Sequence, residues 1–242
     1  MNYFFVLVSL MTSLAFAQYS PVEKLVPLEH VYIPFGFDSN DNTEVIIAGY
    51  LPNTCYKAPR AKFHINQGKI EITVSALYYK NEHQPCTQVT IPFVEVASLG
   101  PMYQGAYNVV ANQGTAFEKR AHLLVSPSVS NTKDVYLYAR VQAIEAIQGT
   151  RRVILKGYNP SDCFELREIM TISNKTDTYS ILPVLKMDEG SICHRKMVAF
   201  SYEYEVPVEL NLRKVLLHVR SMDGHSVNAI YDNAYNVIDK TY

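Results

Sequence analysis

Two stretches of this chain read alike and decide its fold. The first is Val45-Ile46-Ile47-Ala48-Gly49-Tyr50-Leu51-Pro52-Asn53-Thr54-Cys55, and the second is Val153-Ile154-Leu155-Lys156-Gly157-Tyr158-Asn159-Pro160-Ser161-Asp162-Cys163. They are offset by 163 − 55 = 108 residues, and the next cysteine of each copy by 193 − 86 = 107. A unit of roughly 105 residues has the usual size of an independent domain. The repeat therefore predicts two tandem domains.

Weaker correspondences flank the two copies. Val31-Tyr32-Ile33 and Val135-Tyr136-Leu137 stand upstream, and Phe93 and Phe200 stand downstream. We place the first domain at residues 25–125 and the second at residues 134–235, with the connection within residues 112–133.

The N-terminal residues have the pattern of a secretory signal peptide. An apolar stretch from Phe4 to Ala15 closes on Ala15-Phe16-Ala17, the small-x-small pattern that precedes a cleavage site. The segment lacks lysine and arginine, and a membrane anchor is the alternative interpretation. An apolar run of about a dozen residues is short of the ~20 that span a bilayer. We therefore predict cleavage of residues 1–17 and export to the periplasm or the extracellular space.

The cysteines follow from this prediction and from the repeat. Four cysteines in an exported chain indicate disulfides. Duplication of a closed unit favours the pairs Cys55 with Cys86 and Cys163 with Cys193. Free, buried thiols are the alternative.

The charge balance argues against nucleic acids and anionic lipid surfaces as partners. The formal net charge is −1, from 22 basic and 23 acidic residues. Neither half of the chain is strongly basic, so neither carries the field that recruits polyanions.

Strand signals dominate the remaining sequence. Val135 to Ala143 alternates with a period of two, which is typical of a half-buried strand. Similar runs are Glu44–Leu51, Lys69–Leu77, Val89–Val96, Ala106–Ala111, Arg152–Tyr158, Thr178–Leu185, Lys196–Val206 and Leu210–Arg220. Many short strands separated by turn residues predict an all-β fold, with one disulfide-stapled sandwich or barrel in each repeat.

The Gly-Tyr-x-Pro-x-x-Cys element resembles immunoglobulin-like modules of secreted bacterial proteins. It occurs as Gly49 to Cys55 and again as Gly157 to Cys163. The chain departs from antibody domains because it contains no tryptophan and spaces its cysteines more closely. The resemblance implies two tandem immunoglobulin-like β-sandwiches and no particular activity.

A search for catalytic and metal motifs finds none, so we predict no catalytic residues, no metal and no cofactor. The histidines are scattered and do not have the spacing of a zinc protease. The acidic run Asp38 to Glu44 has oxygens at alternate positions, but Thr43 stands where a calcium loop requires glycine. Asn174-Lys175-Thr176 matches the acceptor pattern for N-glycosylation.

Exposed tyrosines are the candidate partner-binding residues, because tyrosine offers a rigid apolar face with a polar tip. The candidates are Tyr78, Tyr79, Tyr202 and Tyr204, although half-buried strand positions favour tyrosine equally. We expect a non-catalytic binding or adhesion protein that presents two rigid modules to a protein or glycan partner. The alternatives are a self-associating structural subunit of an envelope or surface assembly, which makes a homo-oligomer possible, and a hydrolase with no local motif.

Overall fold

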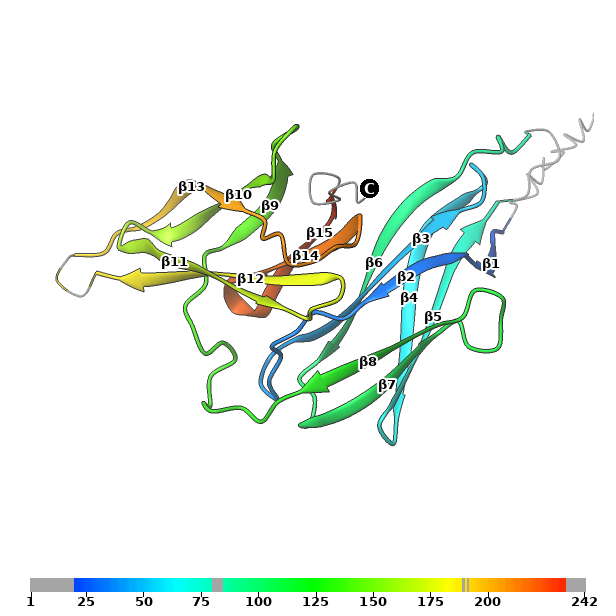
Figure 1. Ribbon diagram of the computed structural model, residues 1–242, viewed down its shortest axis with the longest axis horizontal. Helices are drawn as coiled ribbons and strands as arrows, with labels where there is room; N and C mark the ends of the chain where they lie inside the picture. The colour runs from blue at the N-terminus through cyan, green and yellow to red at the C-terminus, as the bar shows by residue number, and fades with distance from the viewer. Residues whose placement is uncertain (1–19, 80–84, 189, 191, 234–242) are drawn as a thin grey trace, which may run out of the picture.

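The computed structural model describes residues 20–79, 85–188, 190 and 192–233. The predicted signal peptide, residues 1–17, lies outside them. The described chain is all-β and forms two sandwich-like halves (Figure 1). Each half carries one disulfide. The predicted fold class of two disulfide-stapled β-sandwiches is confirmed. The finer immunoglobulin-like assignment stays a prediction.

The first half contains eight strands in two sheets. They are β1 (Val22–Leu25), β2 (Leu28–Tyr32), β3 (Thr43–Leu51), β4 (Tyr56–Asn66), β5 (Lys69–Tyr78), β6 (Ile91–Gly100), β7 (Gly105–Ala111) and β8 (Lys119–Val125). One sheet has the order β2-β3-β6, and the other has the order β4-β5-β7-β8, with β1 also paired to β5. Both include antiparallel pairs, but β5 and β7 run parallel.

The second half repeats this arrangement. Its strands are β9 (Val141–Ala146), β10 (Arg152–Ser161), β11 (Phe164–Ser173), β12 (Thr178–Met187), β13 (Arg195–Glu205), β14 (Lys214–Ser221) and β15 (His225–Asp232), with a short 3-10 turn, Met222–Gly224, before the last strand. The sheets are β9-β10-β13 and β11-β12-β14-β15, and β12 and β14 again run parallel.

Each half has its own hydrophobic core between its two sheets. Alternate residues of β3, including Val45 and Ile47, point into the first core, and Val153 and Leu155 of β10 occupy the same positions in the second. The intervening residues Ile46 and Ala48 are also buried, because they pack against the second half. Burial on both faces explains why β3 reads as a continuous apolar run.

The repeated glycine has a steric reason. Gly49 pairs with Phe93, and Gly157 pairs with Phe200. A Cβ atom on Gly157 would lie 2.0 Å from the carbonyl oxygen of Arg140 and 2.8 Å from the ring of Phe200. A side chain at either glycine would collide with backbone and with the phenylalanine, which accounts for both the glycine and the downstream phenylalanine of the repeat.

The predicted strand from Val135 to Ala143 is only partly correct. β9 begins at Val141, and the preceding segment contributes one isolated bridge, between Tyr138 and Val184. Backbone bonds from Ala139 N to Pro183 O and from Leu185 N to Leu137 O hold this segment along β12, as β1 lies along β5. The alternation therefore reflects an extended segment that pairs with the last part of β12, beyond the residues of β12 that pair with β14.

The upstream correspondence of the repeat is wrong. Val31 pairs with Ile47, and Ile144 pairs with Leu155, which is the repeat counterpart of Ile47. The counterpart of Val31 is therefore Ile144, not Val135. The constant offset of the repeat does not extend to these strands, because the loop after β2 is longer than the loop after β9.

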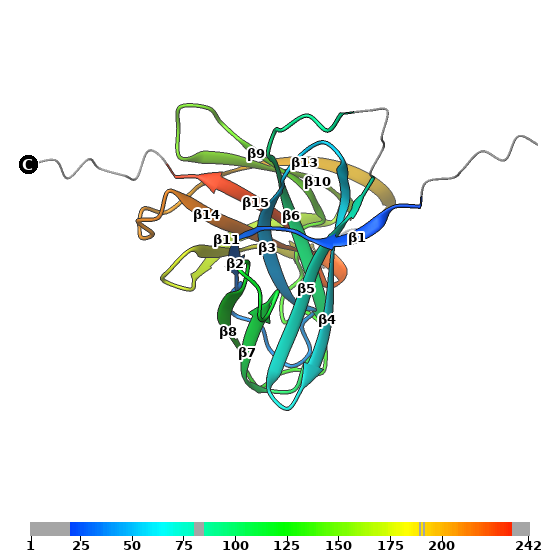
Figure 2. The same cartoon turned by 90° about the vertical axis from the view of Figure 1, so that its right-hand side faces the viewer.

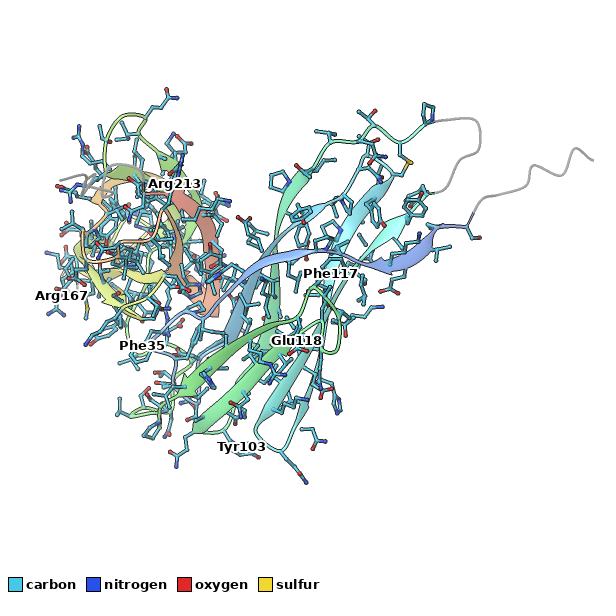
Figure 3. All side chains as sticks on the ribbon, turned by 45° about the vertical axis from the view of Figure 1, so that its right-hand side comes forward. Phe35, Tyr103, Phe117, Glu118, Arg167 and Arg213 are labelled. Atoms are coloured by element: carbon cyan, nitrogen blue, oxygen red, sulfur yellow. A yellow bond between two sulfur atoms is a disulfide. The ribbon has the colours of Figure 1, made fainter. Side chains whose placement is uncertain are left out.

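The two halves meet through sheet faces rather than through a linker alone. Figure 2 shows β14 and β15 beside β2 and β3, and the side chains of these strands form a shared apolar cluster. Phe35 lies where the halves meet, and Tyr103 lies at a far edge of the first half (Figure 3). The relative placement of the two sandwiches is thus fixed by packing.

Candidate functional site

The junction between the halves has an apolar centre. Tyr32, Ile46 and Ala48 of the first half contact Leu216 and Ile230 of the second. These side chains stand on the outer faces of their sheets, where a solitary domain would expose them. Burial of this apolar patch removes hydrocarbon from water and so stabilises the docked arrangement of the two halves.

A buried ion pair lies next to this patch. The Arg220 guanidinium on β14 lies 2.9 Å from the Asp41 carboxylate and donates to the carbonyl oxygen of Gly36 at 2.6 Å. It also lies over the Phe37 ring, 5.0 Å from its centroid. Burial raises the pKa of Asp41, and the charge of Arg220 opposes this effect. The pair holds the loop after β2 to the second half.

A second polar cluster surrounds His218, which is fully buried. Its Nδ1 lies 2.8 Å from the side-chain oxygen of Asn228 and 3.9 Å from the Glu44 carboxylate. Ser226 donates to the same carboxylate at 2.5 Å. Burial lowers the pKa of His218 to about 4 and raises the pKa of Glu44. The hydrogen bonds of this cluster are therefore made with His218 in its neutral form.

The β11–β12 turn makes the third contact between the halves. Asp177 Oδ2 lies 2.6 Å from His30 Nε2, and Ser180 exchanges hydrogen bonds with both the N–H and the carbonyl of Phe35. The Asn174 amide donates to Ile33 O at 3.2 Å and to Asp177. Because this amide is engaged in the junction, the sequence match to a glycosylation acceptor does not identify an accessible site.

The acidic run considered as a calcium loop belongs to the junction instead. Asp41 and Glu44 face the second half, and Asp38 accepts a backbone hydrogen bond from Asn40. No group of three or more metal-ligating side chains occurs among the described residues. Sequence reasoning missed the junction because its partners lie more than 170 residues further along the chain.

An open cleft lies on the second half, between the edge strands β9 and β15. Its volume is about 500 Å³. It is lined by Ile144, Ala146, Ile147, Gln148, Gly149, Thr150, Val153, Leu217, Ala229, Ile230, Tyr231 and Asp232. Most of these side chains are apolar, and the small residues Ala146, Gly149 and Ala229 leave its space unfilled. Arg213, labelled in Figure 3, lies 3.4 Å from Asp232 at its rim.

The corresponding opening of the first half, between β2 and β8, is closed at one end by the chain itself. The loop after β2 spans residues 33–42, whereas the loop after β9 spans only 147–151. Ser126, directly after β8, donates its N–H to Phe37 O at 3.0 Å, and the Phe37 side chain is buried in the first core. The remaining opening is bordered by the β11–β12 turn.

The predicted tyrosines do not form one surface. Tyr79 is exposed, and Tyr78 is half-buried beneath Lys24, whose Nζ lies 4.0 Å from the ring centroid. Tyr202 is half-buried and stacks on Phe200, with ring centroids 4.3 Å apart.

The position of Tyr204 contradicts the prediction that it is an exposed partner-binding residue. It belongs to the second core, and its hydroxyl lies 2.7 Å from Thr171 Oγ1. It is a core residue rather than part of an exposed platform. The two predicted pairs also stand in different halves, Tyr78–Tyr79 at the end of β5 and Tyr202–Tyr204 on β13, and the structure does not bring them together.

Both predicted disulfides are present, Cys55–Cys86 and Cys163–Cys193. They indicate that the chain folds in an oxidising, extracytoplasmic environment. Within the described ranges, no helix is long and apolar enough to cross a membrane.

Comparison with known proteins gives one match. Residues 45–120 match the family model of the ORF11 beta-sandwich domain. The match covers β3 to β8 and agrees with the sandwich architecture of the first half. No curated protein and no solved structure matches the chain.

Proposed function

We propose that this protein is a non-catalytic, exported binding protein that presents two rigidly docked β-sandwiches to a protein or glycan partner. The observation that carries the proposal is the open, mostly apolar cleft between β9 and β15. A concave apolar site with a few polar groups at its rim is the usual form of a ligand site.

The junction supports the same proposal. An apolar patch, the Asp41–Arg220 ion pair and the β11–β12 turn hold the two halves in one arrangement. Rigid presentation lowers the entropy that a binding surface loses when it engages a partner. Two docked modules therefore offer a preformed surface larger than either module alone.

The test is saturable association of the full, oxidised protein. Labelled protein is added to intact cells of the producing strain and to an array of glycans, with excess unlabelled protein as competitor. We expect saturable, competed binding to at least one of these surfaces. Non-saturable or uncompeted signal on all of them contradicts the proposal.

Self-association as a structural subunit is the second candidate, and the chain has exposed strand edges that would permit it. β4 and β6 stand at the edges of their sheets and carry exposed apolar side chains, among them Phe63 and Val94. Light scattering of the purified protein distinguishes this candidate from binding to a separate partner.

A further inference from the structure

Phe37 shows how one end of an opening between sheet edges is closed within this molecule. Its ring is 3% exposed and belongs to the first core together with Val31 and Val125. Its carbonyl accepts a hydrogen bond from Ser126, the residue that follows β8. The loop therefore closes one end of the gap between β2 and β8 with one aromatic side chain and one backbone contact. An opening of about 360 Å³ remains along the rest of the gap, beside the β11–β12 turn.

The second half has the corresponding opening, but its loop after β9 inserts no aromatic side chain at the end that Phe37 closes in the first half. Sheet register makes Ile144 the counterpart of Val31, and Leu217 and Ala229 the counterparts of Val109 and Ala121. The loop after β9 is five residues shorter (33–42 against 147–151) and contains no aromatic residue. The open cleft of about 500 Å³ lies at this position.

We infer that this cleft is a binding site for a polypeptide segment that inserts an aromatic side chain between β9 and β15, at the end that corresponds to the one closed by Phe37 between β2 and β8. The inference rests on the proposed binding function and names the ligand of its site. An aromatic side chain buries roughly 150–250 Å² of surface, which suits a cleft of this size. Ile144, Val153 and Leu217 supply an apolar wall, and the Thr150 carbonyl stands at the rim, where it already accepts from the Tyr231 hydroxyl.

A glycan is a poorer fit to the same cleft. Sugar rings require several polar partners, and among the lining side chains only Gln148, Thr150, Tyr231 and Asp232 carry polar groups. The half-exposed Ile144 and Ile147 gain more from an apolar occupant, because their burial removes hydrocarbon from water.

The probe is a peptide copy of the loop that carries Phe37. A synthetic peptide with the sequence of residues 33–40, Ile-Pro-Phe-Gly-Phe-Asp-Ser-Asn, is titrated into the full oxidised protein, and backbone amide shifts are followed by NMR. We expect saturable shifts at Ala146, Gly149 and Ala229, with a dissociation constant in the millimolar range or lower, as expected for one aromatic anchor. The same peptide with alanine in place of the residue that corresponds to Phe37 should bind at least about tenfold more weakly.

A matched pair of variants locates the site. Ala229→Leu fills the cleft and should weaken binding of the peptide at least about tenfold, whereas Ala106→Leu, at an exposed position of β7, should leave it unchanged. Ala146→Leu gives a second filling variant if Ala229→Leu lowers the melting temperature.

Three results overturn the inference. The first is the absence of saturable shifts, and the second is binding that Ala229→Leu does not weaken. The third is binding of the peptide only to a chain that stops at Asn233. That result would mean that the protein's own C-terminal residues occupy the cleft. If the wild type associates saturably with cells or glycans and Ala229→Leu associates equally well, the proposed function stands and the assignment of this cleft fails.

Discussion

Gly157 leaves no space for a side chain, because Arg140 O and the Phe200 ring would both contact a Cβ atom. We expect Gly157→Ala to lower the free energy of unfolding by about 2–3 kcal/mol, as overpacking of a closed site does. Urea denaturation of the oxidised protein measures this. Gly190→Ala is the control, because a Cβ atom there would lie 3.8 Å from Asp188 Oδ1, an ordinary van der Waals distance. Its effect on the free energy of unfolding should stay within about 0.5 kcal/mol. Equal stability of the two variants would refute the steric explanation of the repeated glycine.

His218 makes stability depend on pH. Its pKa is about 4 in the folded protein, against 6.5 for the ordinary side chain. Between these values the unfolded chain takes up a proton and the folded chain does not, so stability falls as the pH drops from 6.5 to 4. The difference of 6.5 − 4 = 2.5 pKa units corresponds to about 3 kcal/mol. Urea denaturation at pH 7 and pH 4 measures the loss.

The control for this prediction is His218→Gln, which cannot titrate and should remove most of the loss between pH 6.5 and 4. Glu44 acts with the opposite sign, because its raised pKa lets the folded state keep a proton that the unfolded chain releases. Its ionisation lowers stability as the pH rises, and this contribution is common to both proteins. An unchanged pH profile in His218→Gln would show that other groups cause the acid sensitivity.

At the residue scale, the sequence predicted the disulfides well and the junction poorly. The even number of cysteines in a chain predicted to be exported indicated disulfides, and the repeat indicated the pairs Cys55–Cys86 and Cys163–Cys193. The acidic run at Asp41 and Glu44 has a local pattern, but its meaning depends on Arg220 and Ser226, which only the docking of the halves brings near. A pattern within a few residues cannot reveal partners from another domain.

At the element scale, each disulfide anchors the start of an edge strand. Cys163 lies directly before β11, and Cys193 lies before β13, with a sequence separation of 30 residues. Closing a loop of this length contributes about 3–4 kcal/mol in the chain-entropy model. We expect the double substitution Cys163→Ser and Cys193→Ser to lower stability by this amount, as measured by thermal and urea unfolding.

The first half provides the comparison for that prediction. Its bridge spans 31 residues, so the double substitution Cys55→Ser and Cys86→Ser should cost a similar amount. A large difference between the two double variants would mean that native contacts around the bridges, rather than loop closure, dominate their contribution.

Strand prediction succeeded where burial is regular. β3, β5, β7, β10 and β12 were found because their apolar residues are continuous or alternate. β4 and β11 were missed because they are edge strands whose exposed positions carry mixed charged and apolar residues. The cleft was missed for another reason: it results from a difference in loop length between the repeats, and loop length has no periodic signal.

At the scale of the whole molecule, the apolar pattern of the junction is missing from the equivalent outer faces of the two halves. The counterparts of Ile46 and Ala48 in the second half are Ile154 and Lys156, and the counterpart of Tyr32 is Glu145. Lys156 and Glu145 form an ion pair at 2.5 Å. On the first half, Asn108 and His122 stand where the second half has Leu216 and Ile230.

A second molecule that docked in the manner of the two halves would therefore bury charged and polar groups, which costs several kcal/mol without matched partners. We predict that the protein stays monomeric by multi-angle light scattering from dilute to concentrated solution. The quadruple variant Glu145→Tyr, Lys156→Ala, Asn108→Leu and His122→Ile restores the apolar pattern of the junction on both outer faces. Because that contact is head-to-tail, the variant should form open-ended chains whose mass grows with concentration. Growth of the wild type in the same experiment would favour the structural-subunit hypothesis over binding to a separate partner.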